Sequence, residues 1–259
     1  MNQSQRRADY DQIAPTFDRR YARNEYAGVE RALREFIGRE PGLRILEAGC
    51  GTGHWLDVLQ ASENYVMGLD FSAGMLARAR ESLPEAALIR GTAQQLPLPA
   101  ASLDRVFCIN AIHHFPNKPA FLREVRRVLR PVGKMLSVGL DPHTGIDRWH
   151  VYDYFKESLS IDRQRYPSSD ALCEWMIEAG FQDCTTCEVD HWITRLPAHE
   201  ALVQGHLDKA VTSQLSVLTE DEYERGIQQI QSDMKRADAQ GQTLFLTTDL
   251  RMYATIGSV

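Results

Sequence analysis

The sequence has no apolar run long enough to cross a bilayer, and its start, MNQSQRRADYDQ, lacks the apolar core of a secretory signal. It also lacks an excess of positive charge, since the formal charge is −6 and the pI is about 5.8. That balance argues against non-specific binding to phosphate backbones. We therefore expect a cytoplasmic protein with no membrane partner, for which nucleic acid is an unfavoured partner.

Cysteine is scarce, and its pattern excludes a zinc site of the usual spacing. Only Cys184 and Cys187 form a C-x-x-C, and no second pair completes four ligands. The surrounding FQDCTTCEVDHWI is typical of a strand, on which residues three apart point to opposite faces. We predict no metal site and no redox role for this pair, and five cysteines fit a reducing compartment.

Short apolar segments alternate with amphipathic helices from residue 43 onward, and 259 residues can bury a sizeable core. This alternation predicts an α/β, Rossmann-like sheet of seven mostly parallel strands, the last antiparallel, with helices on both faces. The expected strands are Arg44–Glu47, Tyr65–Asp70, Ala87–Arg90, Arg105–Asn110, Lys134–Leu140, Cys184–Trp192 and Thr243–Ile256.

The stretch GLRILEAGCGTGHW places Gly49, Gly51 and Gly53 between a strand and a helix. Backbone without Cβ atoms can approach a ligand closely, and the amides of such a loop point at it. A dinucleotide site prefers G-x-G-x-x-G, whereas the third glycine of that pattern is replaced here by His54. The spacing therefore disfavours a nicotinamide-dependent oxidoreductase.

The second strand, within YVMGLDFS, ends in Asp70. An acid at this place can accept hydrogen bonds from both hydroxyls of an adenosine ribose. Phe71 and Met75 follow it and are placed to enclose an adenine. The alternative is that Asp70 caps the next helix, which Ser72 would do equally well. We favour ribose binding.

Four motifs follow in order: E-x-G-x-G-x-G, G-L-D-F-S, G-x-A-x-x-L-P, and S-L-D-x-V with a later H-H-F. Together they resemble the class I S-adenosylmethionine-dependent methyltransferases, within them the small-molecule branch that includes ubiquinone and menaquinone C-methyltransferases. The amino-terminal YDQIAPTFDRRY is similar to the entry of that branch. The resemblance covers about residues 9–140, and residues 169–192 loosely.

The resemblance implies S-adenosylmethionine as cofactor and assigns a role to each matching position. Glu47 and the three glycines would line its methionine end, Asp70 would bind the ribose, and Asn110 would offer its carbonyl to the amino group. The adenine would lie between Phe71 and Met75 with Thr92 and Ala93 at its edge, and Tyr10 and Tyr21 would close a lid. Two positions depart from the pattern: Thr92 replaces an acid, and Phe17, on the substrate side, replaces a tyrosine.

His113 and His114 follow the fourth strand, where substrate approaches in this fold. Methyl transfer needs a base only if the nucleophile must lose a proton, and an imidazole suits that task at neutral pH. We expect His114 to act as base or substrate contact and His113 to contact substrate. The alternative is that one packs in the core and the other caps the next helix.

The insertion Asp141–Ser168 follows the fifth strand and is rich in aromatic residues. We expect it to face a small, partly apolar substrate through Trp149, Tyr152 and Arg163. The alternative is that its rings only pack the insertion onto the rest of the chain. The substrate would then contact residues 195–240, whose polar candidates are His199, His206 and Tyr223.

We thus expect one domain over residues 1–259, acting as a methyltransferase on a small-molecule acceptor as a monomer or homodimer. Its parts are a lid (1–30), a cofactor-binding core (31–140), a substrate lid (141–168) and carboxyl-terminal strands (169–259) that contain a helical insertion (195–240). A non-catalytic S-adenosylmethionine-binding protein is the main alternative, because methyl transfer requires few fixed side chains. An RNA methyltransferase is less favoured because of the acidic balance.

Overall fold

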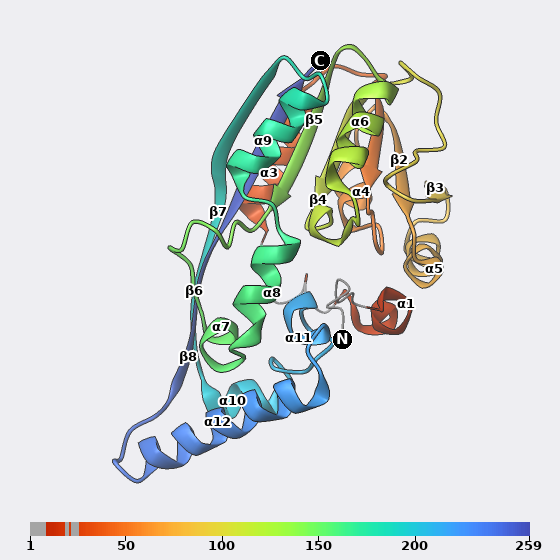
Figure 1. Cartoon of the computed structure of the whole chain (residues 1–259). Helices are drawn as coiled ribbons and strands as arrows, with labels where there is room; N and C mark the ends of the chain where they lie inside the picture. Colours follow the sequence, from red (N-terminus) through yellow and green to blue (C-terminus); the bar gives the residue numbers. More distant parts are fainter. Residues whose placement is uncertain (1–8, 19–20, 22–25) are drawn as a thin grey trace.

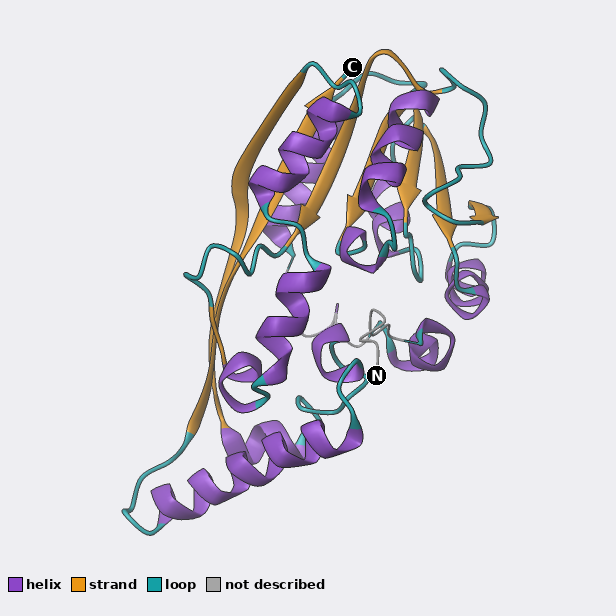
Figure 2. Ribbon diagram, in the orientation of Figure 1, coloured by secondary structure: helices purple, strands orange, loops and turns teal. Residues whose placement is uncertain are grey.

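Eight strands form one sheet in the computed structural model, which describes residues 9–18, 21 and 26–259 (Figures 1 and 2). The strand order is β3-β2-β1-β4-β5-β8, and both β7 and the short β6 pair with β8. The strands are β1 (Arg44–Ala48), β2 (Tyr65–Asp70), β3 (Ala87–Arg90), β4 (Leu103–Ile109), β5 (Leu129–Gly139), β6 (Arg148–Trp149), β7 (Asp183–Pro197) and β8 (Phe245–Ser258). The first five are parallel to their neighbours, while β8 is antiparallel to β5, β6 and β7. The predicted fold class is confirmed, with β6 as an added strand.

Helices bury both faces of the parallel part of the sheet. On one face, α6 (Lys118–Val128) and α9 (Ser169–Glu178) contribute Phe121, Val125 and Met176 to a buried cluster. On the other, α3 (Ala27–Ile37) and α4 (His54–Leu59) contribute Leu33 and Trp55 to a second cluster. The helix α5 (Ala73–Ser82) follows β2. This layering brings the carboxyl ends of β1, β2 and β4 to one edge, where ligands bind in such sheets.

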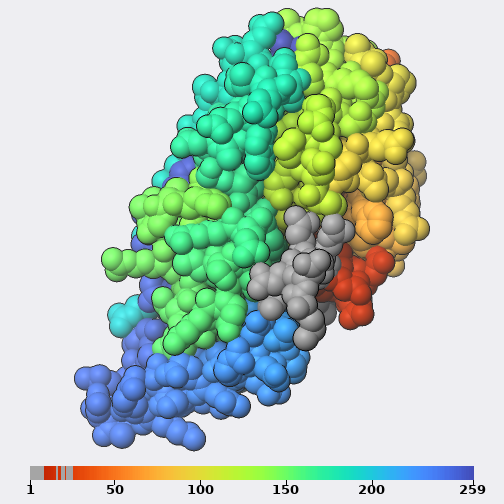
Figure 3. Space-filling model, in the orientation of Figure 1, coloured from red at the N-terminus to blue at the C-terminus, as the bar shows by residue number. Residues whose placement is uncertain are grey.

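A helical cover lies beyond that edge and has its own apolar core, which includes Trp149, Phe155 and Ile230. It consists of α7 (His150–Tyr154), α8 (Glu157–Arg165), α10 (Ala198–Val203), α11 (Ser213–Ser216) and α12 (Glu220–Asp238). The long ribbon formed by β7 and β8 extends beyond the parallel strands and carries the cover, whose blue carboxyl-terminal helices form the lower end of the molecule in Figure 3. Among the described helices, none combines the length and apolarity needed to cross a membrane.

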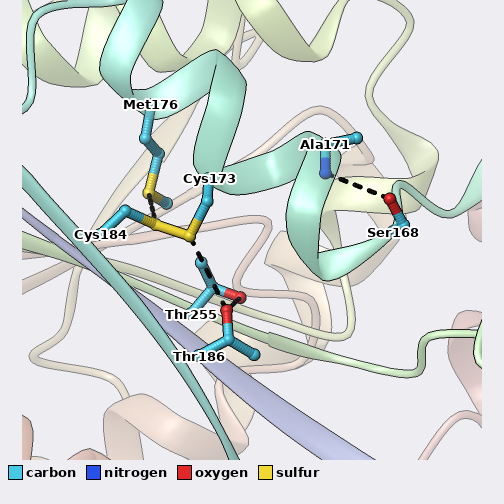
Figure 4. The surroundings of a disulfide bond; sticks show 7 residues. All are labelled: Ser168, Ala171, Cys173, Met176, Cys184, Thr186 and Thr255. Atoms are coloured by element: carbon cyan, nitrogen blue, oxygen red, sulfur yellow. Dashed lines mark hydrogen bonds between the residues drawn. A yellow bond between two sulfur atoms is a disulfide. The ribbon is translucent and has the colours of Figure 1, made fainter.

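One cysteine pairing differs from the sequence-based expectation. Cys173 of α9 forms a disulfide with Cys184 of β7, which is 11 residues further along the chain (Figure 4). The expectation of five cysteines in a reducing compartment did not include this disulfide. It considered only the C-x-x-C pair, whereas the helix-to-strand connection brings Cys173 beside Cys184. Cys187 is a free, exposed thiol.

We predict that the denatured, unreduced protein contains three reactive thiols, and five after reduction. Closing a short loop stabilises a protein by up to about 3 kcal/mol through the unfolded state. Cys173→Ser with Cys184→Ser should therefore lower the midpoint of urea unfolding, whereas Cys187→Ser should not. Five reactive thiols before reduction would contradict the pairing.

Candidate active site

The loop between β1 and α4 adopts a conformation that requires glycine. Gly49, Gly51 and Gly53 have φ angles of 78°, 52° and 86°, in the left-handed region that other residues seldom adopt. A Cβ on Gly49 would lie 2.5 Å from the Cβ of Ala111, and one on Gly53 would lie 2.9 Å from Leu83. The loop thus forms a narrow cradle of bare backbone at the end of β1.

Asp70 holds this loop in place from the end of β2. Its carboxylate accepts hydrogen bonds from the Gly51 amide (2.8 Å) and from the Ser72 amide (2.9 Å). Burial raises the pKa of Asp70, and these amide bonds oppose that rise. The helix cap itself is Ser72, whose hydroxyl accepts the Met75 amide at 3.0 Å. The alternative role of Asp70 as the capping side chain is therefore excluded.

Glu47 is a buried acid directly below the glycine loop. Only 1% of it is exposed, and its Oε2 has no hydrogen-bond partner among the described residues. Burial raises its pKa well above the ordinary value of 4.5, and the charge of Asp70 adds to the rise. A buried acid with an unsatisfied oxygen beside a bare-backbone cradle fits a ligand that brings a positive charge.

The residues expected around an adenine have different environments. Phe71 is 71% exposed, and Thr92 is exposed as well. Met75 is 1% exposed because it packs against Ala14 and Phe17, and Ala93 is buried. Phe71 is therefore accessible to a ring, whereas Met75 lies beneath the amino-terminal segment.

That segment lies across the cradle, and begins with α1 (Tyr10–Ile13) and a 3-10 turn (Ala14–Thr16). The Asp11 carboxylate accepts hydrogen bonds from the Ser72 hydroxyl (2.5 Å) and the Gly74 amide (2.9 Å). A Cβ on Gly51 would lie 3.6 Å from the Phe17 ring.

Tyr21 stacks on His54 with ring centroids 3.7 Å apart, and Asp18 accepts a hydrogen bond from the Thr52 hydroxyl. The segment thus contacts both the cradle and the start of α4. The rest of the predicted lid, residues 1–8, 19–20 and 22–25, lies outside the described residues.

The turn after β4 brings further predicted residues to the same edge. Asn110 has a φ of 50°, an uncommon conformation that often marks functional sites. The turn Ile112–His114 follows, with His113 buried and His114 half-buried. The Nε2 atom of His114 is hydrogen-bonded to the Tyr10 hydroxyl at 2.5 Å. The candidate base and the amino-terminal segment are thus in direct contact.

His113 contacts the cover. Its Nε2 is hydrogen-bonded to the Tyr166 hydroxyl at 3.0 Å, and the two rings stack with centroids 3.9 Å apart. The same hydroxyl accepts a hydrogen bond from the Gln214 amide at 3.0 Å. Tyr166 is one of the aromatic residues of the predicted insertion, whereas Gln214 was missed because its segment offers neither a motif nor a clear period.

The residues expected to line the substrate lid are engaged within the cover. Trp149 is 7% exposed in the apolar core of the cover, and Tyr152 donates a hydrogen bond to Asp162 at 2.9 Å. Arg163 is exposed and donates to the Pro142 carbonyl, whereas Arg165, two positions later, is buried.

The alternative candidates also lie in the cover. His199 is exposed beside Glu200, His206 is hydrogen-bonded to Gln204, and Tyr223 donates to the Leu207 carbonyl. These positions place all three on the helical lobe that follows β7.

A parallel sheet, a glycine cradle at the end of its first strand and an acid at the end of its second are features of nucleotide-binding α/β folds. Comparison with known proteins agrees, since residues 46–137 match the family described as methyltransferase domain. Phosphoethanolamine N-methyltransferase 2 of Haemonchus contortus, solved with S-adenosyl-L-methionine, superimposes with a TM-score of 0.61 at 19% identity. That match covers 96% of this chain and 57% of that one.

Curated relatives extend the match in sequence. The phthiotriol/phenolphthiotriol dimycocerosates methyltransferase of Mycobacterium leprae is 38% identical over 51% of this chain and 50% of that protein. The demethylmenaquinone methyltransferase of Listeria welshimeri is 28% identical over 66% of this chain and 77% of that protein. The chain spans about half the length of the curated relatives that are at least 30% identical to it. For two of them the matched part is 52% and 50% of the relative's own length.

The resemblance to class I S-adenosylmethionine-dependent methyltransferases is therefore confirmed, and S-adenosylmethionine is the cofactor of the class. The cradle fits it, because Gly49, Gly51 and Gly53 leave backbone accessible and Glu47 can balance a positive charge.

We predict that Asp70→Ala weakens binding of S-adenosylhomocysteine by 2–3 kcal/mol, roughly 30- to 150-fold, because a charge-assisted contact to the ribose is lost. Stability should also fall by about 1–2 kcal/mol, since the Gly51 and Ser72 amides lose their acceptor. Calorimetry and urea unfolding measure the two effects, with the exposed Asp57→Ala as control. Unchanged affinity would show that Asp70 only supports the loop.

Glu47→Gln tests the buried acid through pH. Because the folded-state pKa of Glu47 is raised above 4.5, the folded wild type loses stability relative to the variant as the pH rises above that value. Each pKa unit by which the folded state differs from the unfolded state corresponds to about 1.4 kcal/mol in the free energy of unfolding. Urea unfolding of the cofactor-free protein at pH 5 and pH 8 should show this gap, and the exposed Glu63→Gln should not. Parallel pH profiles for wild type and Glu47→Gln would refute the raised pKa.

Proposed function

We propose that the chain is an enzyme that transfers the methyl group of S-adenosylmethionine to a small-molecule acceptor. The observation that carries this proposal is the contact between the Tyr10 hydroxyl and the His114 imidazole beside the glycine cradle. A protein that only binds the cofactor needs the cradle and Asp70. It has no need of a proton-accepting pair at the edge where the acceptor approaches.

The bound cofactor supplies an electrophilic methyl group on a sulfonium that is a good leaving group. The chain supplies orientation: Asp70 would hold the ribose, and Glu47 with the glycine loop would hold the methionine end. Fixing the acceptor in line with the methyl–sulfur bond contributes several kcal/mol on the scale of well-oriented intramolecular reactions. Side chains that bind and orient therefore provide most of the catalysis.

An acceptor that must lose a proton would give it to His114. The imidazole can take that proton at Nε2, the atom to which the Tyr10 hydroxyl is hydrogen-bonded. The Tyr10 hydroxyl would then bind either the acceptor or the protonated imidazole. His113, stacked on Tyr166, supports the turn from the other side. In this proposal Tyr10 belongs to the acceptor site as well as to the lid over the cofactor.

Small molecules are favoured as acceptors by the relatives, whose names refer to dimycocerosates of phthiotriol, demethylmenaquinone and phosphoethanolamine. Nucleic acid is disfavoured because three arginines of α6 and the start of β5 form contacts with other parts of this chain. Arg126 donates to the Gly180 carbonyl, Arg127 pairs with Glu124, and Arg130 pairs with Asp104. A cytoplasmic location remains a prediction, and the Cys173–Cys184 disulfide is the observation against it.

The experiment measures transfer of radiolabelled methyl groups from S-adenosylmethionine into fractionated small-molecule extracts, and then the kinetics of variants. His114→Ala should lower kcat about a hundredfold or more, as expected for loss of a base. Tyr10→Phe should lower it less and leave cofactor affinity unchanged, because its ring still packs on Phe17. Glu63→Ala, at an exposed position with no role in the proposal, serves as control. Full turnover in His114→Ala with every acceptor would exclude it as base, and no transfer into any fraction would oppose the enzymatic proposal.

A further inference from the structure

A buried ammonium group lies at the start of α6, four residues after His114. Lys118 is only 8% exposed, and its Nζ donates a hydrogen bond to the Phe115 carbonyl at 3.3 Å. Within residues 9–18, 21 and 26–259, no carboxylate forms an ion pair with it. Lysines are almost never buried to this extent unless they are paired, so its position requires an explanation.

A second buried cation lies nearby, at the end of α8. Arg165 is 6% exposed and donates hydrogen bonds to the carbonyl (3.2 Å) and the hydroxyl (2.9 Å) of Ser213. Its nearest carboxylate is Asp162, at 3.5 Å. Burial lowers the pKa of Lys118, and the charge of Arg165 lowers it further, so the two cations act on one another.

These two cations flank the histidine turn at the carboxyl edge of the sheet. Lys118 belongs to the helix that follows the turn, and Arg165 directly precedes Tyr166, which binds His113. Figure 1 shows α8 below the ends of β4 and β5. Asp162 pairs with Arg165 at 3.5 Å, and burial raises the pKa of Asp162. The cluster therefore carries excess positive charge beside the proposed base.

We infer that the methyl acceptor carries an oxyanion, a carboxylate or a phosphate, that binds to Lys118 in the field of Arg165. An oxyanion would supply the missing counter-charge, and charge-assisted hydrogen bonds to an ammonium are stronger than neutral ones. Lys118 would thereby orient the acceptor against His114. This inference rests on the proposed function for the acceptor's identity, but anion binding can be measured without methyl transfer.

The simpler explanation is that Lys118 only packs its aliphatic stem and caps the Phe115 carbonyl. The two explanations predict opposite results for Lys118→Met, which keeps the length of the side chain and removes the charge. If the charge has no ligand, its removal should leave anion binding unchanged and stabilise the protein, because a buried unpaired charge is costly. If the charge binds an acceptor, anion binding is lost.

The first experiment measures binding of radiolabelled inorganic phosphate by equilibrium dialysis at constant ionic strength, with and without S-adenosylhomocysteine. Wild type and Lys118→Arg should bind phosphate, and Lys118→Met should bind it at least tenfold more weakly. Lys134→Met, which removes the same charge from an exposed position of β5, should match wild type. Equal binding by all four proteins, or by none, would overturn the inference.

The second experiment compares acceptors in matched pairs: each carboxylic acid with its methyl ester, and each phosphate monoester with its alcohol. Lys118→Met should lower kcat/KM at least tenfold for the charged member of a pair and leave it unchanged for the neutral member. Whether the wild type prefers the carboxylic acids or the phosphate monoesters shows which oxyanion the site binds. Equal loss for both members, or preference for the neutral one, would contradict the inference. Phosphate binding by the cofactor-free protein keeps this test separate from failure of the proposed methyl transfer.

Discussion

The two amide hydrogen bonds of the Asp70 carboxylate are the interaction on which the rest of the site depends. They connect the β1–α4 loop, through Gly51, to the β2–α5 turn, through Ser72. The amides of Gly49 and Cys50 also donate to the Leu69 carbonyl, so three hydrogen bonds attach the loop to β2. Since Asp11 binds the Ser72 hydroxyl, the amino-terminal segment belongs to the same network. The glycine loop, Asp70 and the amino-terminal segment therefore form one hydrogen-bonded unit.

Charge is distributed unevenly along this edge of the sheet. Two acids with raised pKa values, Glu47 and Asp70, lie at the cradle, where a ligand with positive charge would bind. Two buried cations, Lys118 and Arg165, lie beyond the histidine turn. Between them, His114 is hydrogen-bonded to Tyr10. An arrangement of this kind would place a cationic cofactor and an anionic acceptor on opposite sides of one base. The acids would attract the cofactor to the cradle, and the cations would attract the acceptor to the other side.

Sequence patterns predicted the parts of the fold that obey short-range rules. The strands through Asp70 and the glycine loop follow from periodicity and backbone conformation, so their positions agree with the structure within a few residues. The cover could not be predicted in this way. The helix α8 has almost no amphipathic pattern, and the sequence therefore could not show that Arg165 rather than Arg163 is buried. The disulfide and the contact of Tyr10 with His114, 104 residues apart, depend on tertiary packing that no local pattern encodes.

The central claim, that the cradle held by Asp70 is a site for S-adenosylmethionine, is tested most directly by calorimetric titration of the wild-type protein. S-adenosylmethionine and S-adenosylhomocysteine should both bind with dissociation constants on the order of micromolar, about −8 kcal/mol. NADH and NADPH should give no measurable heat, because His54 replaces the third glycine of a dinucleotide loop. Tight binding of either nicotinamide nucleotide, with none of the adenosyl compounds, would contradict the account.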